Sequence, residues 1–227
     1  FVLSLLMVFL RIQEPDKRNN DFVKIIKIVA NKFARFYIFV IRGTPMMVQS
    51  LIFYYAIFNL FKRTGMSVTE INRVWSLFIS GLVTVSLNST AYLAEVLRGG
   101  ILAVDAGQME AARSLGMTHW QAMRRVVFPQ AIKNSLPAIG NEFIINIKDS
   151  SVLCVLGVSD LMFMTRSVAG IYYKGTECYL IAATVYLFLT YLSSLLLKTI
   201  TGRMTAPDNT KRRQGNQTVD LGLPSSN

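Results

Sequence analysis

Long apolar stretches alternate with short polar intervals along most of the chain, and this alternation predicts a bundle of membrane helices. Predominantly apolar runs occupy residues 44–61, 74–97, 136–156 and 179–197. Each run is close to the roughly 20 residues that a helix needs to cross the hydrocarbon core of a bilayer. Residues 1–10 are equally apolar but too short to cross. We expect them to be part of an incomplete first membrane helix, or a shorter element.

The segment 22–41 has the periodicity of a helix and is basic on one face. Its basic residues are Lys24, Lys27, Lys32 and Arg35. Such a helix is typical of a membrane surface that contains anionic lipid. Residues 62–73 read as a polar loop and residues 157–174 as a partly helical loop. The predicted parts are a partial membrane helix with a basic surface helix (1–41), a transmembrane core (42–200) and a polar, disordered tail (201–227).

The longest polar interval between strongly apolar runs, residues 104–129, carries its own helix start and stop signals. Asp105 with a glutamine three residues later predicts a helix start, and Gly116 is placed to end that helix as a left-handed cap. Thr118, again with a glutamine three residues later, predicts a second start. Pro129 is expected to interrupt the second helix. The interval is therefore predicted to form two short helices joined by a glycine turn.

Composition agrees with a membrane protein and gives its orientation. Of the 227 residues, 52% are hydrophobic and only 16% are charged, whereas soluble domains have about 25% charged residues. Lys and Arg number 24 against 13 Asp and Glu. Eighteen of the basic residues fall on the same side of the predicted bundle as residues 104–129, and five on the other side. Because basic loops stay in the cytoplasm, we expect this interval to be cytoplasmic.

The sequence shows no motif for a metal site or a nucleotide-binding site. The two cysteines lack metal-ligand spacing, and no GxxxxGK[ST] phosphate loop occurs. We therefore expect no metal site, no bound nucleotide and no enzymatic activity in this chain.

Polar residues inside the apolar runs are the candidates for a transport path. Charged side chains at membrane depth usually face a bundle interior or a water-filled path. Several of them share a helix face because they lie seven residues apart. Substrate contact and mutual pairing, for example of Lys148 with Asp149 or Glu95, both remain open. The candidate path residues are Asn88, Tyr92, Glu95, Asn141, Glu142, Lys148 and Asp149.

Four short motifs resemble the permease subunits of bacterial ABC importers for polar amino acids, of the histidine/glutamine/arginine type. EAARSLG (110–116), with a later Phe-Pro pair, resembles the EAA loop of that family. RGTP (42–45), NSTAYLAEVLRGGI (88–101) and the run that begins GNEFIINIKDSS at residue 140 resemble other parts of it, in the family's order. In the family the EAA loop is a coupling helix that docks in a groove of the ATP-binding subunit.

The residues of the EAA-like stretch fit such a docking role. Ala111 and Ala112 give one helix face no bulk, so a partner surface can approach closely. Glu110 lies near the positive end of the helix dipole, where a carboxylate is favoured. The predicted coupling residues are Glu110, Ala111, Ala112, Leu115 and Gly116.

The resemblance implies an all-α membrane protein, a type I ABC-importer permease bundle of about five transmembrane helices with a cytoplasmic coupling helix. It implies import of a polar or charged amino acid across the bacterial cytoplasmic (inner) membrane. ATP and Mg would be bound by two separate ATP-binding subunits. A second permease, identical or homologous, and an extracytoplasmic amino-acid-binding protein are the further partners it implies.

Two alternatives belong to other functional classes. Residues 111–126 also look like a DNA-binding helix-turn-helix, which would make the chain a membrane-anchored regulator. That motif needs a soluble domain, whereas these residues are bracketed by apolar runs, so we expect no nucleic-acid partner. A secondary amino-acid transporter is the other alternative. Stimulation of ATP hydrolysis by an added binding protein would separate an ABC importer from both.

Overall fold

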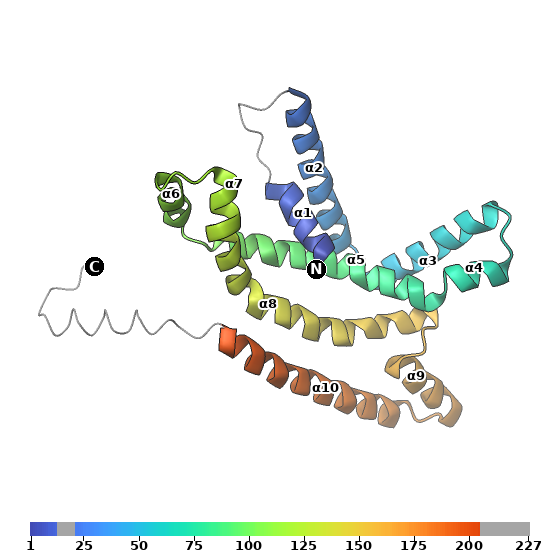
Figure 1. The fold of residues 1–227 in the computed structure, drawn as a ribbon. Helices are drawn as coiled ribbons and strands as arrows, with labels where there is room; N and C mark the ends of the chain where they lie inside the picture. Colours follow the sequence, from blue (N-terminus) through green and yellow to red (C-terminus); the bar gives the residue numbers. More distant parts are fainter. Residues whose placement is uncertain (13–20, 205–227) are drawn as a thin grey trace, which may run out of the picture.

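The structure, a computed structural model, describes residues 1–12 and 21–204, and over these residues it is built from helices (Figure 1). This confirms the predicted all-α class. The α-helices are α1 (Val2–Ile12), α2 (Asp21–Gly43), α3 (Met46–Arg63), α4 (Val68–Val74), α5 (Leu77–Leu102), α6 (Ala106–Ser114), α7 (His119–Ala122), α8 (Phe128–Asp149), α9 (Leu161–Tyr172) and α10 (Gly175–Met204). A π-helix, Met123–Val127, precedes α8, and a 3₁₀-helix, Ser150–Leu156, follows it.

Three long helices form the body of the molecule. Helices α5, α8 and α10 run side by side, with α8 packed between the other two (Figure 1). Helices α1, α2 and α3 all pack against α5, and α9 packs against α10. The loop helices α6 and α7 lie at one end of the long helices, and α4 and α9 lie at the other (Figure 1).

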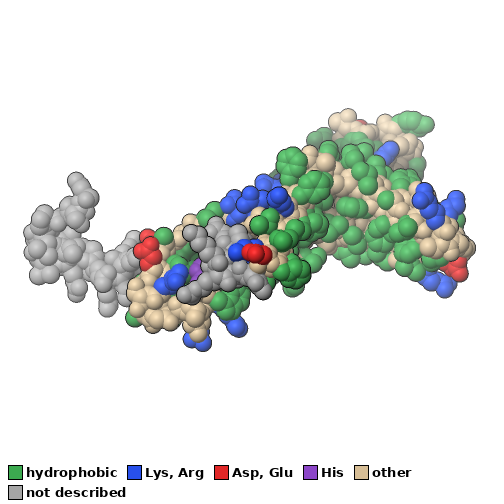
Figure 2. All heavy atoms as spheres, turned by 90° about the horizontal axis from the view of Figure 1, so that it is seen from above, with side chains coloured by type: hydrophobic (Ala, Val, Ile, Leu, Met, Phe, Trp, Pro, Cys, Tyr) green, Lys and Arg blue, Asp and Glu red, His purple; other side chains and the backbone are tan. Residues whose placement is uncertain are grey.

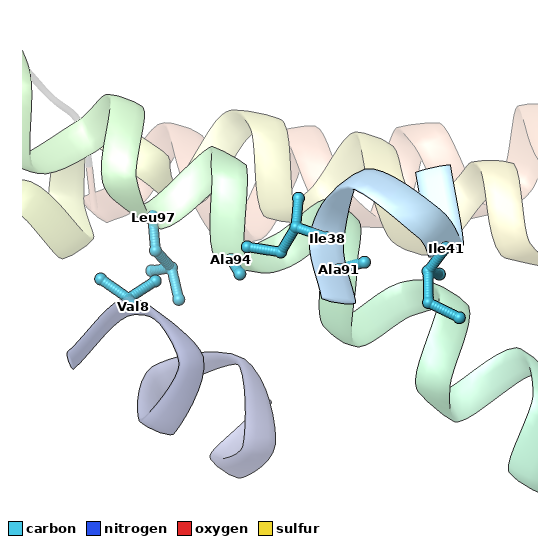
Figure 3. Close-up of a cluster of buried hydrophobic side chains, with 6 residues drawn as sticks. All are labelled: Val8, Ile38, Ile41, Ala91, Ala94 and Leu97. Carbon is cyan, nitrogen blue, oxygen red and sulfur yellow. The ribbon is translucent and has the colours of Figure 1, made fainter. Parts of the chain in front are cut away.

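A small apolar core joins the N-terminal helices to α5. Val8 of α1 lies against Leu97, and Ile38 and Ile41 of α2 lie beside α5 where it carries alanines (Figure 3). Alanine at these positions allows two backbones to approach closely, which is how helices associate in a membrane. The buried members of this core are Val8, Ile38, Ile41, Ala91, Ala94 and Leu97.

Length and apolarity identify helices that can cross a membrane. Among the described residues, α5 and α10 each qualify alone. The number rises to four if α2 with α3, bent by 112°, and the helix from His119 to Leu156 with α9, bent by 53°, each count as one span. The predicted span at residues 44–61 corresponds to α3, which meets this criterion only together with α2.

The predicted break at Pro129 is wrong. The chain is helical without interruption from His119 to Leu156, and Pro129 lies in the first turn of α8. The π-helix just before it changes the hydrogen-bond register at this point.

The region predicted as a polar loop at 62–73 contains a helix, α4. Ser67 caps it: its hydroxyl accepts from the Glu70 N–H at 3.3 Å, and the Glu70 carboxylate accepts from the Ser67 N–H at 2.8 Å. The next membrane helix, α5, begins after its cap Ser76 rather than at residue 74, and it continues to Leu102 rather than to residue 97. Local capping residues, not the apolar run alone, set these boundaries.

The C-terminal boundary also differs from the expectation. Helix α10 continues to Met204, so residues 201–204 belong to the last long helix and not to the tail. The remainder of the predicted tail, 205–227, lies outside the described residues, as do residues 13–20.

Candidate functional site

The polar interval 104–129 forms the two predicted short helices, α6 and α7. Asp105 caps α6, although its carboxylate accepts from the Gly107 N–H at 2.6 Å and not through the expected reciprocal pair with glutamine. Thr118 and Gln121 make the predicted capping box of α7: the Thr118 N–H donates to Gln121 at 2.9 Å. Local sequence therefore defines both helix starts.

Gly116 makes the turn between α6 and α7. Its φ is +83°, in the left-handed region that favours glycine. Its N–H donates to the Arg113 carbonyl at 3.0 Å, and the Met117 N–H donates to the Ala112 carbonyl at 3.2 Å. These two bonds are a complete Schellman motif, which satisfies carbonyls at the end of α6. The predicted glycine cap is confirmed.

The outer surface of α6 is available to a partner. Glu110 and Ala111 are exposed, and Leu115 exposes 82% of its surface, an unusual fraction for a large apolar side chain. Ala112 is buried, because α6 packs against α7 and the π-helix. The expectation that both alanines face a partner is therefore wrong for Ala112. The small side chain of Ala112 allows close packing inside the loop. Of the two alanines, only Ala111 lies on the outer surface, where its small side chain lets a partner approach closely.

Two contacts tie the loop to the membrane helices. The ring of Trp120 meets Phe9 of α1 edge-on, with ring centres 5.7 Å apart. Gln130 of α8 donates to the side chain of Gln108 in α6 at 3.2 Å. A displacement of α6 and α7 would therefore be transmitted to both α1 and α8.

The structure does not favour a DNA-reading role for this loop. Helix α7 has four residues and continues without a break through the π-helix into α8. A recognition helix has to enter a major groove, whereas this one begins a long helix packed between α5 and α10.

A polar cluster lies where α2 turns into α3, next to α5. Gln49, 5% exposed, donates to the carbonyls of Ile41 at 2.7 Å and Thr44 at 2.9 Å. It thereby satisfies backbone groups that the end of α2 leaves open. Asn88 of α5 donates to the Gln49 side-chain carbonyl at 3.3 Å. Broken helices that surround polar groups within a bundle are a feature of transporter substrate sites.

Charged side chains and an aromatic ring also lie near this bend: Arg42, Glu142 and Tyr92. The Arg42 guanidinium lies 5.1 Å from the centre of the Tyr92 ring, a cation–π arrangement. Glu142 of α8 is buried, with 9% of its surface exposed, and the charges acting on its carboxyl group are those of Asp149 and Arg42. Asn146, one turn further along, accepts from the Ser89 hydroxyl at 3.0 Å and so ties α8 to α5.

Glu95 is engaged by two arginines. Its carboxylate pairs with Arg11 of α1 and with Arg98, whose Nε lies 3.0 Å from it. The ion-pair partners of Glu95 are therefore these two arginines, and not Lys148, which was one of the partners considered from the sequence. Asn31 of α2 donates to the Arg11 carbonyl at 2.8 Å, so the network joins α1, α2 and α5. Its immediate effect is to hold the N-terminal helices on α5.

The remaining candidate path residues are exposed in the single chain. Asn141 and Lys148 lie on one face of α8, seven residues apart, and both are exposed, as is Asp149. Glu142 alone among the α8 candidates is buried. The structure thus brings Asn88, Tyr92 and Glu142 near one bend, and it places the others at the surface or in the arginine network.

Sequence reasoning missed two members of this cluster, Arg42 and Gln49. Arg42 belongs to the RGTP motif, which was interpreted only as part of the family resemblance. Gln49 lies in an apolar run four residues after the proline of that motif, a polar residue that could have been found by the same reasoning as Asn88. The sequence pattern did not predict the bend between α2 and α3 that brings Arg42 and Gln49 to α5.

Comparisons with known proteins agree with this arrangement. Residues 26–206 match the family described as binding-protein-dependent transport system inner membrane component. The glutamine transport system permease protein GlnP of Escherichia coli (strain K12) is 34% identical over 176 residues, which are 78% of this chain and 76% of that protein. The probable amino-acid permease protein YxeN of Bacillus subtilis (strain 168) is 37% identical over 182 residues, 80% of this chain and 78% of that protein.

Two solved structures share the fold. A crystal structure of an amino acid ABC transporter with histidines superposes with a TM-score of 0.71 at 40% identity, over 89% of this chain and 84% of that one. The MetNI methionine ABC transporter superposes with a TM-score of 0.66 at 18% identity, over 90% and 87%, and shows the fold alone. The chain therefore belongs to the inner membrane components of binding-protein-dependent transport systems, the permease subunits of ABC transporters, in which ATP hydrolysis resides on partner subunits.

Proposed function

We propose that this permease imports a polar or charged amino acid and is driven by two ATP-binding subunits that dock on α6. The observation that carries the docking role is the exposed surface of α6, which ends in the Gly116 turn and presents Glu110, Ala111 and Leu115. ATP and Mg are bound by the partner subunits. A second permease and an extracytoplasmic binding protein complete the transporter.

Movement of the ATP-binding subunits reaches the membrane through named contacts. Closure of the two subunits displaces α6, and the contact of Gln108 with Gln130 carries the displacement to α8. The contact of Trp120 with Phe9 carries it to α1. Because α8 is one continuous helix from the loop to the buried Glu142, motion of the loop changes the surroundings of that carboxyl group.

We expect Glu110→Lys to weaken assembly with the ATP-binding subunit. Glu110 is exposed on α6, and a lysine there reverses the charge of the docking surface. It lies in the middle of α6 and not in the first turn, so the expected contribution of the helix dipole is absent. Loss of one favourable rim contact slows association, and the difference from the wild type is expected to be largest at low salt, because salt screens the charges. Co-purification of the ATPase with the permease at increasing salt measures this. Glu177→Lys, at an exposed carboxylate in the first turn of α10, is the matched control. Equal co-purification of both variants would remove support for docking through Glu110.

The proposed substrate path lies at the bend between α2 and α3. A free amino acid carries an ammonium and a carboxylate group, and neither crosses hydrocarbon without polar partners. The Glu142 carboxylate can receive the ammonium group, and the Arg42 guanidinium can receive the carboxylate. Asn88 can donate and accept, and Tyr92 can contact the side chain of the substrate. Asn141, Lys148 and Asp149 border the path on α8, and Glu95 positions α1 against α5.

We expect Glu142→Gln to raise the half-saturating concentration of transported substrate and to change substrate preference while the protein stays folded. The amide has the same shape but no charge for the ammonium group. Uptake by the reconstituted transporter, measured with competing arginine, histidine, lysine, glutamine and glutamate, tests this. Glu177→Gln, the same change at an exposed carboxylate of α10 outside the path, is the matched control. If Glu142→Gln only lowers the melting temperature and leaves preference unchanged, Glu142 has a structural role.

A further inference from the structure

We propose that α2 is an interfacial helix that binds the headgroups of anionic phospholipids through Lys27, Lys32 and Arg35, with its apolar side in the outer part of the hydrocarbon region. This binding surface is separate from the coupling helix and from the proposed substrate path. It rests on the packing, the charge and the direction of α2.

Within the described part of the chain, the buried residues of α2 all lie in its C-terminal half, and the N-terminal half makes one side-chain hydrogen bond to another helix, from Asn31 to the Arg11 carbonyl. Ala34, Ile38 and Ile41 are buried against α5, and the Tyr37 hydroxyl donates to the Leu87 carbonyl at 2.7 Å. Between Asp21 and Phe33 no residue of the helix is buried. In Figure 1 this half of α2 stands away from the long helices. Some other surroundings must cover it, because it is strongly apolar.

The free part of α2 has an apolar side and a basic side. The apolar side chains follow one another at helical spacing, and each is at least half exposed. They are Phe22, Ile25, Ile26, Val29, Phe33 and Phe36. Lys27 and Arg35 lie on the other side, and Lys32 lies at the edge of the apolar side. None of the three forms an ion pair with the described part of the chain, whereas Lys24 pairs with Asp21 at 3.0 Å. Figure 2, which looks down on this end of the molecule, shows Lys and Arg side chains gathered beside hydrophobic ones.

The direction of α2 places it along the membrane surface. Helices α2 and α3 are bent by 112°, so if α3 runs along the membrane normal, α2 lies about 22° out of the membrane plane. Helix α2 meets α5 at Ala91 and Ala94, in the half of α5 nearer the coupling loop. Ala94 is eight residues from the end of α5, or roughly 12 Å. Helix α5 has 26 residues and is roughly 9 Å longer than the ~30 Å hydrocarbon core, so if it is centred in the bilayer, Ala94 lies roughly 7–8 Å inside the boundary. Apolar faces of interfacial helices are buried to about this depth.

Charge favours lipid over a second copy of the permease as the occupant of this surface. The chain carries 24 basic and 13 acidic residues, so another copy brings mostly like charge to three unpaired cations. Lysine is also depleted in protein–protein interfaces. An anionic headgroup layer neutralises the cations, and each basic side chain near such a surface strengthens association about five-fold. The acyl chains cover the phenylalanines at the same time.

The first test measures headgroup preference with the full-length permease in vesicles. Spin-labelled phosphatidylglycerol and phosphatidylcholine report the lipid in contact with the protein. The wild-type protein is expected to prefer phosphatidylglycerol, and Lys27→Gln/Lys32→Gln/Arg35→Gln to reduce that preference several-fold. Lys62→Gln/Arg63→Gln/Arg73→Gln, which removes three exposed cations near the opposite end, is expected to change it little. Equal preference in the two triple variants, or no preference in the wild type, overturns the proposal.

The second test locates the apolar side. The parent protein has two native tryptophans, so its fluorescence is the reference. Phe36→Trp is expected to add fluorescence, and lipids with brominated acyl chains are expected to quench the added part. Leu115→Trp, in the exposed coupling loop, is expected to show little quenching. If Phe36→Trp is shielded from brominated lipid as strongly as Leu115→Trp, a protein surface covers α2 and the lipid proposal fails. Neither measurement depends on transport, so its result stands apart from the proposed import function.

Discussion

Gly100→Ala is expected to force α5 and α8 apart and to lower the melting temperature of the permease by several degrees. A methyl group at Gly100 would lie 1.9 Å from the Ser135 hydroxyl oxygen and 2.6 Å from the Ala131 carbonyl oxygen. Both distances are far below contact distance. The Ser135 side chain is 2% exposed and donates to Ala131 at 2.8 Å, so it has no free space to enter. The carbonyl belongs to the backbone of α8, so the helix itself must move.

The adjacent residue supplies the control. A methyl group at Gly99 meets no atom within 4 Å. Gly99→Ala is therefore expected to leave the melting temperature unchanged or to raise it, because alanine favours a helix over glycine by up to ~1 kcal/mol. Overpacking at Gly100 typically costs about 1–3 kcal/mol. Thermal unfolding of both variants in detergent or lipid gives the comparison.

A double variant separates the two clashes. Ser135→Ala removes the hydroxyl but leaves the Ala131 carbonyl in place. Gly100→Ala/Ser135→Ala should therefore recover only part of the loss. Full recovery would show that the side chain alone limits the approach of α5 and α8. Equal melting temperatures of the Gly99 and Gly100 variants would contradict the close crossing itself.

The elements that sequence predicted correctly depend on neighbouring residues. The cap at Thr118 and the left-handed turn at Gly116 require nothing beyond residues three or four positions away, and both are present. The apolar runs located the long helices for the same reason. Helix α4 was missed although its signal was equally local: Ser67 and Glu70 form a capping box in a stretch read only as polar.

The features that escaped prediction depend on distant parts of the chain. Arg11 and Glu95 are 84 positions apart, and nothing in their local sequence indicates the pair. The 112° bend that brings Gln49 to Asn88 is likewise a property of packing. Pro129 shows the opposite failure: a local rule predicted a break, and the π-helix before it gave the chain another way to continue. Ala112 was expected on the outer surface because the sequence pattern could not show that α6 packs against α7 and the π-helix.

Gly116→Val is expected to uncouple ATP hydrolysis from uptake while the permease still inserts. A methyl group at Gly116 meets no atom within 4 Å, so any effect comes from the backbone and not from a clash. The φ of +83° costs an L-residue roughly 1–2 kcal/mol, and a β-branched residue more. The strain is relieved if the turn changes conformation. That change breaks the bonds from Gly116 and Met117 that end α6, and so it misplaces the docking surface.

A graded series and a remote control make the effect specific to the turn. Asparagine tolerates the left-handed region, so Gly116→Asn should retain most coupled uptake, Gly116→Ala less and Gly116→Val least. Gly65, between α3 and α4, has a φ of +88° and equally open surroundings. Gly65→Val therefore imposes the same kind of strain away from the coupling loop and should leave coupling intact. The readout is uptake per ATP hydrolysed by the reconstituted transporter. Normal uptake by Gly116→Val, or an equal loss in Gly65→Val, would contradict a role for this turn in positioning α6.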